Sequence, residues 1–183
     1  PLAVICRDRA SGRGIRVGDV EHIISMYADD ILLYVADMNR DIPDRLLLLG
    51  TFGRYSGLKL NLGNTYVYPL LHDTLEPENL AAGITWAPVS FRYLGVQIYH
   101  KQEDMCEGNV GVAVSALKGS VGIWKSLTLP GMARVTLVKI IVLLRLLYHF
   151  VNMPTWIPLT WFRQIEGMIR ELIWDQGRHR IPL

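Results

Sequence analysis

The sequence predicts an α+β protein in which a lobe of short strands and one helix is followed by an all-helical lobe. Between residues 15 and 100, β-branched and aromatic residues form short runs separated by turn-forming residues, which is typical of strands. From residue 108 onwards, apolar residues recur at helical spacing instead. The charge changes as well, because residues 1–100 hold 9 Lys and Arg against 11 Asp and Glu, whereas residues 101–183 hold 10 against 6. We therefore predict one domain over residues 1–103 and a helical domain over 104–183.

The first domain is expected to open with a helix and a hairpin. Residues 1–9, "PLAVICRDR", fit the end of an apolar helix somewhat better than a short strand. Residues 15–36 predict one hairpin. Its chain reversal is placed at Ala28-Asp29-Asp30, because Asp tolerates the dihedral angles of a tight turn.

A helix is predicted over residues 39–57, where leucines and aromatic residues follow one another at helical spacing. Asp41 is the candidate N-cap, and Pro43 fits the first turn, where its missing N–H is tolerated. Gly57 fits the C′ position that ends many helices.

The remaining elements follow from the same patterns. Residues 58–70 predict a strand or a hairpin around Gly63-Asn64, residues 72–90 a loop and residues 91–100 a short strand, and helices are predicted over residues 108–129, 132–152 and 159–174. No internal repeat and no low-complexity segment is visible. The modestly basic second half is compatible with a polyanionic partner but does not require one.

Composition excludes several classes of protein. Half of the residues are hydrophobic, which argues against disorder. Cys6 and Cys106 form no CxxC pair and no disulfide framework, so we expect two reduced, buried thiols in an intracellular protein, with nucleus or cytoplasm unresolved.

The N-terminus shows no signal-peptide pattern, and the absence of an initiator Met suggests a piece of something longer. Residues 135–153 could pass for a membrane span, but Lys139 and Arg145 interrupt them, so a buried helix and no membrane partner are expected.

Two adjacent carboxylates interrupt the apolar run "ISMYADDILLYV", residues 24–35. Asp is depleted in strands, so Asp29 and Asp30 need an explanation. Carboxylate oxygens are the ligands that Mg²⁺ prefers, and two metal ions can clamp the attacking and leaving oxygens in phosphoryl transfer. Asp is equally an ordinary turn residue. The stretch by itself leaves both readings open.

The stretch resembles the catalytic hairpin of reverse transcriptases, and more specifically that of LINE-type (non-LTR) retrotransposons. Further blocks along the chain are similar to the same family, in the same order. They are "FGRYSGLKLN" at 52–61, "FRYLGVQI" at 91–98, "WKSLTLPGMARVTLVKIIVLLRLLYHFVNMP" at 124–154 and "IWDQGRHRIPL" at 173–183. The resemblance implies the C-terminal part of a polymerase palm over 1–103, and a thumb with the start of a connector over 104–183.

The resemblance also implies an activity, the copying of RNA into DNA from an RNA template, a DNA primer and dNTPs, with Mg²⁺ as cofactor. Asp29 and Asp30 match the metal-binding acids, Asp29 being the more direct ligand. The other implied residues are Tyr27 and Ala28 near the primer terminus, Lys59 as a proton donor to pyrophosphate, Tyr93, Leu94 and Gly95 as the primer-gripping turn, and Arg134, Lys139 and Arg145 as contacts to backbone phosphates. Three of these assignments have plainer alternatives: Lys59 could be a solvated lysine at the start of a strand, the turn an ordinary core strand end, and the thumb cations plain surface charges. The histidines, His149 among them, are interpreted as structural.

The departures from the family pattern narrow this expectation. The family carries another essential carboxylate on a strand well before the hairpin, and only 28 residues precede Asp29. Asn64 stands where the family usually has Lys, which puts one local contact in doubt. We therefore expect an enzyme fragment that is inactive alone. The alternative is a catalytically inactive remnant that binds nucleic acid or a protein, if it acts at all.

Overall fold

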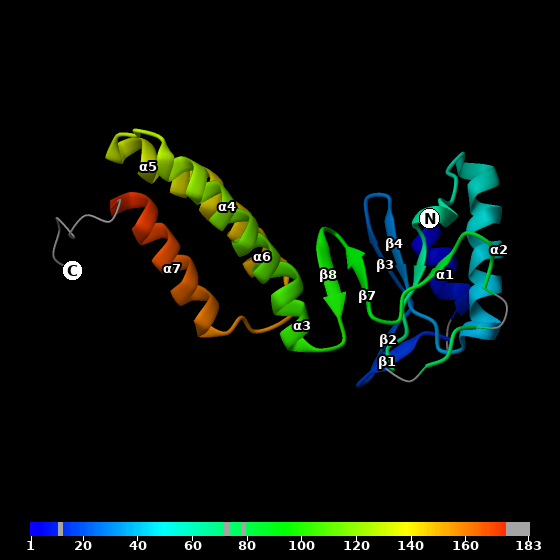
Figure 1. Ribbon diagram of the computed structural model, residues 1–183. Helices are drawn as coiled ribbons and strands as arrows, with labels where there is room; N and C mark the ends of the chain where they lie inside the picture. The colour runs from blue at the N-terminus through cyan, green and yellow to red at the C-terminus, as the bar shows by residue number, and fades with distance from the viewer. Residues whose placement is uncertain (11–12, 72–73, 78–79, 175–183) are drawn as a thin grey trace. The chain divides into compact units, whose positions relative to one another are not determined.

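Short antiparallel hairpins precede a set of long helices in the computed structural model, which describes residues 1–10, 13–71, 74–77 and 80–174. The α+β prediction is confirmed at this level. The chain divides into two compact units, Pro1–Pro88 and Val89–Leu183 (Figure 1). The connector expected from residue 173 onwards lies mostly outside the described residues.

Unit 1 opens with helix α1 (Leu2–Ala10), as predicted. Two hairpins follow: β1 (Ile15–Val17) pairs with β2 (Val20–His22), and β3 (Ile24–Tyr27) pairs with β4 (Asp30–Leu33). The prediction of one hairpin over 15–36 is therefore wrong. The missed signal is the Gly18-Asp19 pair between two valines, because Gly followed by Asp suits a two-residue hairpin loop.

Helix α2 (Met38–Ser56) starts earlier than predicted. Its N-cap is Asp37, whose side chain accepts a hydrogen bond from the backbone N–H of Arg40 at 3.2 Å, and Pro43 lies inside the helix rather than in its first turn. The predicted end is confirmed, since Gly57 adopts the left-handed conformation at φ +76° and donates its N–H to Gly53.

Asp41, the predicted N-cap, is instead a fully buried acid that ties α2 to the segment before β1. Its carboxylate accepts hydrogen bonds from Arg13 Nε at 2.6 Å, Arg40 Nε at 2.9 Å and the backbone N–H of Asp37 at 3.1 Å. Burial alone would raise the pKa of the Asp41 carboxyl, but the hydrogen bonds from two arginines and one backbone N–H outweigh it and lower the pKa to about 2.

Asp41→Asn is expected to lower the free energy of unfolding at neutral pH by about 2 kcal/mol, which the displacement of its pKa represents. A lowered folded-state pKa stabilises the protein above the ordinary carboxyl pKa, and this contribution is lost as the pH falls towards about 2. Urea titrations at neutral and acidic pH measure both effects. Asp44→Asn is the control, because Asp44 bonds Arg13 at 2.7 Å but is exposed. Equal losses in the two variants would contradict the prediction.

Residues 58–70 form little strand. A 3₁₀ turn, η1 (Leu62–Asn64), precedes β5 (Tyr66–Val67), which pairs in parallel with β6 (Thr85–Trp86) inside the predicted loop. The predicted reversal at Gly63-Asn64 is thus a helical turn. The small core of unit 1 consists of Leu2, Cys6, Ile23, Ile24 and Leu48, with α1 and α2 packed against the second hairpin.

Unit 2 begins with a hairpin and continues as helices. Its elements are β7 (Ser90–Tyr93), β8 (Val96–Tyr99), α3 (Gln102–Cys106), the π-helical η2 (Glu107–Gly111), α4 (Val112–Ser126), α5 (Gly131–Leu137), the π-helical η3 (Val138–Leu143), α6 (Leu144–Asn152) and α7 (Leu159–Trp174). The three predicted helical regions are confirmed. The single strand predicted over 91–100 is wrong, because Leu94-Gly95 reverses the chain.

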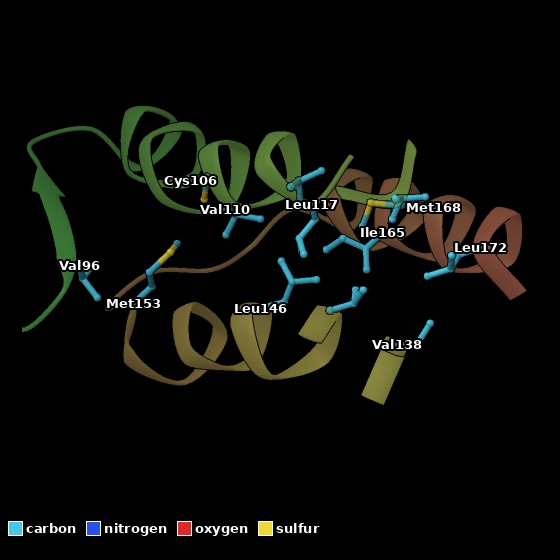
Figure 2. Close-up of a cluster of buried hydrophobic side chains, with 13 residues drawn as sticks. Val96, Cys106, Val110, Leu117, Val138, Leu146, Met153, Ile165, Met168 and Leu172 are labelled. Carbon is cyan, nitrogen blue, oxygen red and sulfur yellow. The ribbon is translucent and has the colours of Figure 1, made fainter. Parts of the chain in front are cut away.

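One hydrophobic core holds unit 2 together (Figure 2). Val96 of β8 belongs to it, along with Cys106 of α3, Leu117 of α4, Leu146 of α6 and Leu172 of α7. The β7–β8 hairpin therefore packs with the helices, and the division between compact units precedes it, whereas the predicted domain boundary at 103/104 follows it. Cys6 and Cys106 are free and buried, as expected, and burial raises the pKa of both thiols.

The continuous helix Gly131–Asn152 is the one described helix that is long and apolar enough to cross a membrane, judged by length and composition alone. The prediction of a buried helix holds for one face only. Val138, Val142 and Leu146 are buried, whereas Ile140 and Val151 are 60% and 78% exposed.

Candidate functional site

Asp29 and Asp30 lie at the tip of the β3–β4 hairpin. Ala28 and Asp29 form its two-residue loop, and Tyr27 pairs with Asp30 across it. All four residues are exposed. Residues opposite each other in an antiparallel pair project from one face, so Tyr27 and Asp30 share a face at the turn end of the hairpin. The predicted position of the reversal is confirmed.

The two faces of this hairpin differ. Ile24, Ile31 and Leu33 belong to or pack against the core of unit 1. Alternation along the strands places Asp30 on the opposite face, with Ser25, whose hydroxyl lies 3.3 Å from that of Tyr34. The apolar face thus anchors the hairpin while its tip presents two carboxylates to solvent.

The backbone of this tip is strained at Ala28, which has a φ of +53°. The β1–β2 loop provides a direct comparison, since Gly18 has the same role there with a φ of +61° and Asp19 follows it as Asp29 follows Ala28. A Cβ makes left-handed dihedrals unfavourable, and glycine avoids this cost. The hairpin with two carboxylates therefore carries strain that its neighbour avoids.

Ala28→Gly is expected to raise the free energy of unfolding by up to about 1 kcal/mol, because glycine relieves the positive φ at a smaller entropic cost. Gly18→Ala, which introduces the same strain into the β1–β2 loop, should lower it by about 1 kcal/mol. Thermal or urea unfolding of both variants measures the pair. A destabilised Ala28→Gly protein would show that the turn is not strained.

Turn chemistry explains one of the two acids. Asp19 and Asp29 occupy the second loop position of sister hairpins, where Asp is ordinary. The next position is Val20 in the first hairpin and Asp30 in the second. Asp30 begins a strand, where Asp is disfavoured, so the hairpin geometry leaves Asp30 unexplained without a function.

The donor set at this tip suits part of a Mg²⁺ site. Two carboxylates supply hard oxygen ligands. Among the residues that the structure describes, however, no group of three His, Cys, Asp or Glu side chains is placed to hold a metal ion. Asp29 and Asp30 could thus hold a metal only together with further ligands.

Lys59 lies two residues after Gly57, the C-cap of α2, outside the helices and strands, and is exposed. It does not lie in a strand, contrary to the prediction of a strand or a hairpin over residues 58–70. Within the described ranges, no hydrogen bond or ion pair joins Lys59 to Asp29 or Asp30, so the structure does not bring the three predicted catalytic residues into contact.

Tyr93, Leu94 and Gly95 meet at the β7–β8 turn of unit 2. Leu94 and Gly95 both have positive φ, +46° and +78°, and so match a type I′ loop. The hydroxyl of Tyr148 on α6 donates a hydrogen bond to the carbonyl oxygen of Leu94. A Cβ at Gly95 would lie 2.8 Å from that hydroxyl oxygen, so only glycine permits this contact. The turn is thereby held against α6.

Asn109 joins the same hairpin to the helices from its other strand. The buried amide of Asn109 accepts a hydrogen bond from the backbone N–H of Gln97 at 2.8 Å and donates to the carbonyls of Gln97 and Met105 at 2.7 and 2.8 Å. Neither Asn109 nor Tyr148 was anticipated from the sequence, because nothing in their local patterns marks the long-range contact.

The three predicted phosphate-contacting cations differ in their surroundings. Arg134 is buried, and its Nε donates a hydrogen bond to the carbonyl of Leu129 at 3.0 Å, so the alternative of a plain surface charge is wrong for this residue, and its phosphate contact stays a prediction. Lys139 and Arg145 are exposed. Arg145 lines a hollow of about 660 Å³ together with Arg92, Tyr148 and His149.

No protein-family model matches the chain.

Proposed function

We propose that this chain is part of an RNA-directed DNA polymerase, the C-terminal palm region and thumb of a reverse transcriptase of the LINE type. The observation that carries the proposal is the β3–β4 hairpin, whose apolar face is anchored and whose tip presents Asp29 and Asp30. A rigid hairpin suits two-metal chemistry, because metal ligands must be held in fixed positions.

The proposed roles follow from position. Asp29 and Asp30 would hold Mg²⁺, which neutralises charge on the reacting phosphate, together with a carboxylate from another strand. Tyr27 and Ala28 would lie near the primer terminus, since they share the tip with the acids. Lys59 is the proposed proton donor to pyrophosphate, and Tyr93, Leu94 and Gly95 would contact the primer strand. The partners would be an RNA template, a DNA primer and dNTPs.

The alternative is a remnant that binds nucleic acid or protein without catalysis. The incomplete ligand set favours it, since the described residues supply only two adjacent acids at the hairpin tip.

The two functions are separated by RNA-templated dNTP incorporation with Mg²⁺, measured on the polypeptide encoded by the complete reading frame. Incorporation supports the polymerase. Binding of primer and template without incorporation supports the remnant. The 183-residue chain alone is expected to incorporate nothing.

Nucleic-acid binding by the chain alone is expected to weaken with salt, because phosphate contacts release counterions. Arg145→Gln should reduce the slope of the logarithm of affinity against that of salt concentration by about 1. Arg163→Gln is the matched control, because Arg163 is exposed on α7 and does not line the hollow. Fluorescence anisotropy with a labelled duplex measures both slopes, and an equal reduction in the control would contradict a role for Arg145.

A further inference from the structure

The hollow beside the β7–β8 turn has walls of mixed origin. The hairpin contributes Arg92, the α3–η2–α4 helix contributes Asn109 and several small residues, and α6 contributes Arg145 and His149. Its volume of about 660 Å³ lies in the range of small-ligand sites. No Asp or Glu is among the described residues that line it, and the charged or titratable side chains in this lining that can carry a positive charge are Arg92, Arg145 and His149.

His149 is the unusual member of this lining. Its Nδ1 is buried and has no hydrogen-bond partner among the residues that the structure describes. Burial lowers the pKa of His149, so the imidazole is neutral at neutral pH. An unpartnered buried nitrogen is costly, and such groups in native proteins call for an explanation.

The uncharged polar side chains in this lining are already hydrogen-bonded to other groups. The amide nitrogen of Asn109 donates hydrogen bonds to the carbonyls of Gln97 on β8 and Met105, and the Gln97 side chain donates to the hydroxyl of Ser90 at 2.8 Å. The Tyr148 hydroxyl donates to Leu94. Near this end of the helix, the Glu107 carboxylate is turned towards Gly111, where a Cβ would lie 2.8 Å from its Oε1. Arg92, Arg145 and His149 thus remain as donors without a neighbouring acid in the lining.

We propose that this hollow binds a phosphate-type oxyanion, with Arg92 and Arg145 supplying fixed charge and His149 becoming protonated as the anion binds. An anion favours the imidazolium, and by reciprocity the imidazolium favours the anion. Binding therefore strengthens as the pH falls through the range in which histidine titrates. The same chemistry could come from a free oxyanion or from a phosphodiester, and only the second source rests on the proposed function.

Sulfate is the probe, because its charge stays constant where histidine titrates. Titrating the wild-type chain with sulfate, and following the His149 ring signals by NMR, should show that sulfate raises the pKa of His149. Sulfate affinity should rise several-fold as the pH falls from about 7.5 to about 5.5, towards the roughly tenfold limit that a displacement of one pKa unit sets. An unchanged His149 pKa at saturating sulfate, or no sulfate binding at the lower pH, would overturn the proposal.

Variants assign the donors. His149→Gln should abolish the pH dependence, and Arg92→Gln should weaken sulfate binding by about tenfold, as expected for the loss of a charge-assisted hydrogen bond. Arg163→Gln should bind as the wild type does, and an equal loss there would show that only net charge matters.

Binding of a short oligodeoxythymidine with the same dependence on pH and on His149 identifies a phosphodiester as the source. Sulfate binding without oligonucleotide binding identifies a free oxyanion. Neither readout uses primer extension, so failure of the polymerase assay leaves this test standing.

Discussion

Asp29→Asn and Asp30→Asn are each expected to lower RNA-templated primer extension by about a thousandfold, since metal-bound carboxylates support several kcal/mol of transition-state stabilisation. Asn keeps the size of the side chain and removes the charge that a metal ion requires. The hairpin should survive both changes, because both side chains are exposed and neither belongs to the core of unit 1. The measurement is dNTP incorporation by the complete polypeptide at saturating Mg²⁺, with circular dichroism as a check on folding.

The matched control for this pair is Asp19→Asn. Asp19 occupies the same loop position in the β1–β2 hairpin as Asp29 does in β3–β4, follows a residue with positive φ and is exposed. Its replacement should leave extension within about twofold, since surface substitutions change little. Unchanged extension by the Asp29 and Asp30 variants would remove the polymerase assignment. An equal loss in Asp19→Asn would point to a general effect of turn chemistry or charge.

Local patterns predicted the elements whose stability is local. The end of α2 follows from Gly57, which can adopt the left-handed φ that the C-cap needs. The reversal at Ala28-Asp29 follows from the turn preference of Asp, and the helix over residues 159–174 follows from the helical spacing of its apolar residues. Where the conformational preference of a residue matches its place in the fold, the sequence alone is enough to predict the element.

The failures come from contacts between distant residues. Asp41 has the chemistry of an N-cap, but Asp37 is the N-cap in the structure. The buried carboxylate of Asp41 instead accepts a hydrogen bond from Arg13, which is 28 residues away in the sequence. Arg134 resembles a surface cation, yet it binds the carbonyl of Leu129. No periodicity announces such partners, since hydrogen bonds across elements depend on tertiary packing.

The residues of the candidate sites also divide into those that the sequence indicates and those that only the structure shows. Asp29 and Asp30 could be singled out because charges stand out in an apolar run. Arg92 and His149 could not, because an arginine and a histidine in apolar company are common. Their significance depends on the walls that enclose them and on the absence of acids from those walls, which only the folded unit reveals.

Leu172→Ala is expected to cost about 3 kcal/mol of unfolding free energy, the usual effect of removing a buried leucine side chain. Leu172 is 1% exposed and belongs to the core that α4, α6 and α7 share (Figure 2). Helices that pack against one another on several sides cannot collapse fully into the space left behind, so a cavity adds to the lost burial. Urea unfolding followed by tryptophan fluorescence measures the change, because Trp124 and Trp161 pack against the same core.

Leu159→Ala, on the same helix, tests whether burial rather than helix propensity sets this cost. Leu159 is 63% exposed, so its replacement should change the free energy of unfolding by less than about 0.5 kcal/mol. Both changes replace Leu by Ala in α7, and Ala is the better helix former, so propensity alone would stabilise both variants slightly. A large loss in Leu172→Ala with none in Leu159→Ala therefore places the stability of unit 2 in its shared core. Similar losses in both variants would mean that burial of the side chain does not set the cost.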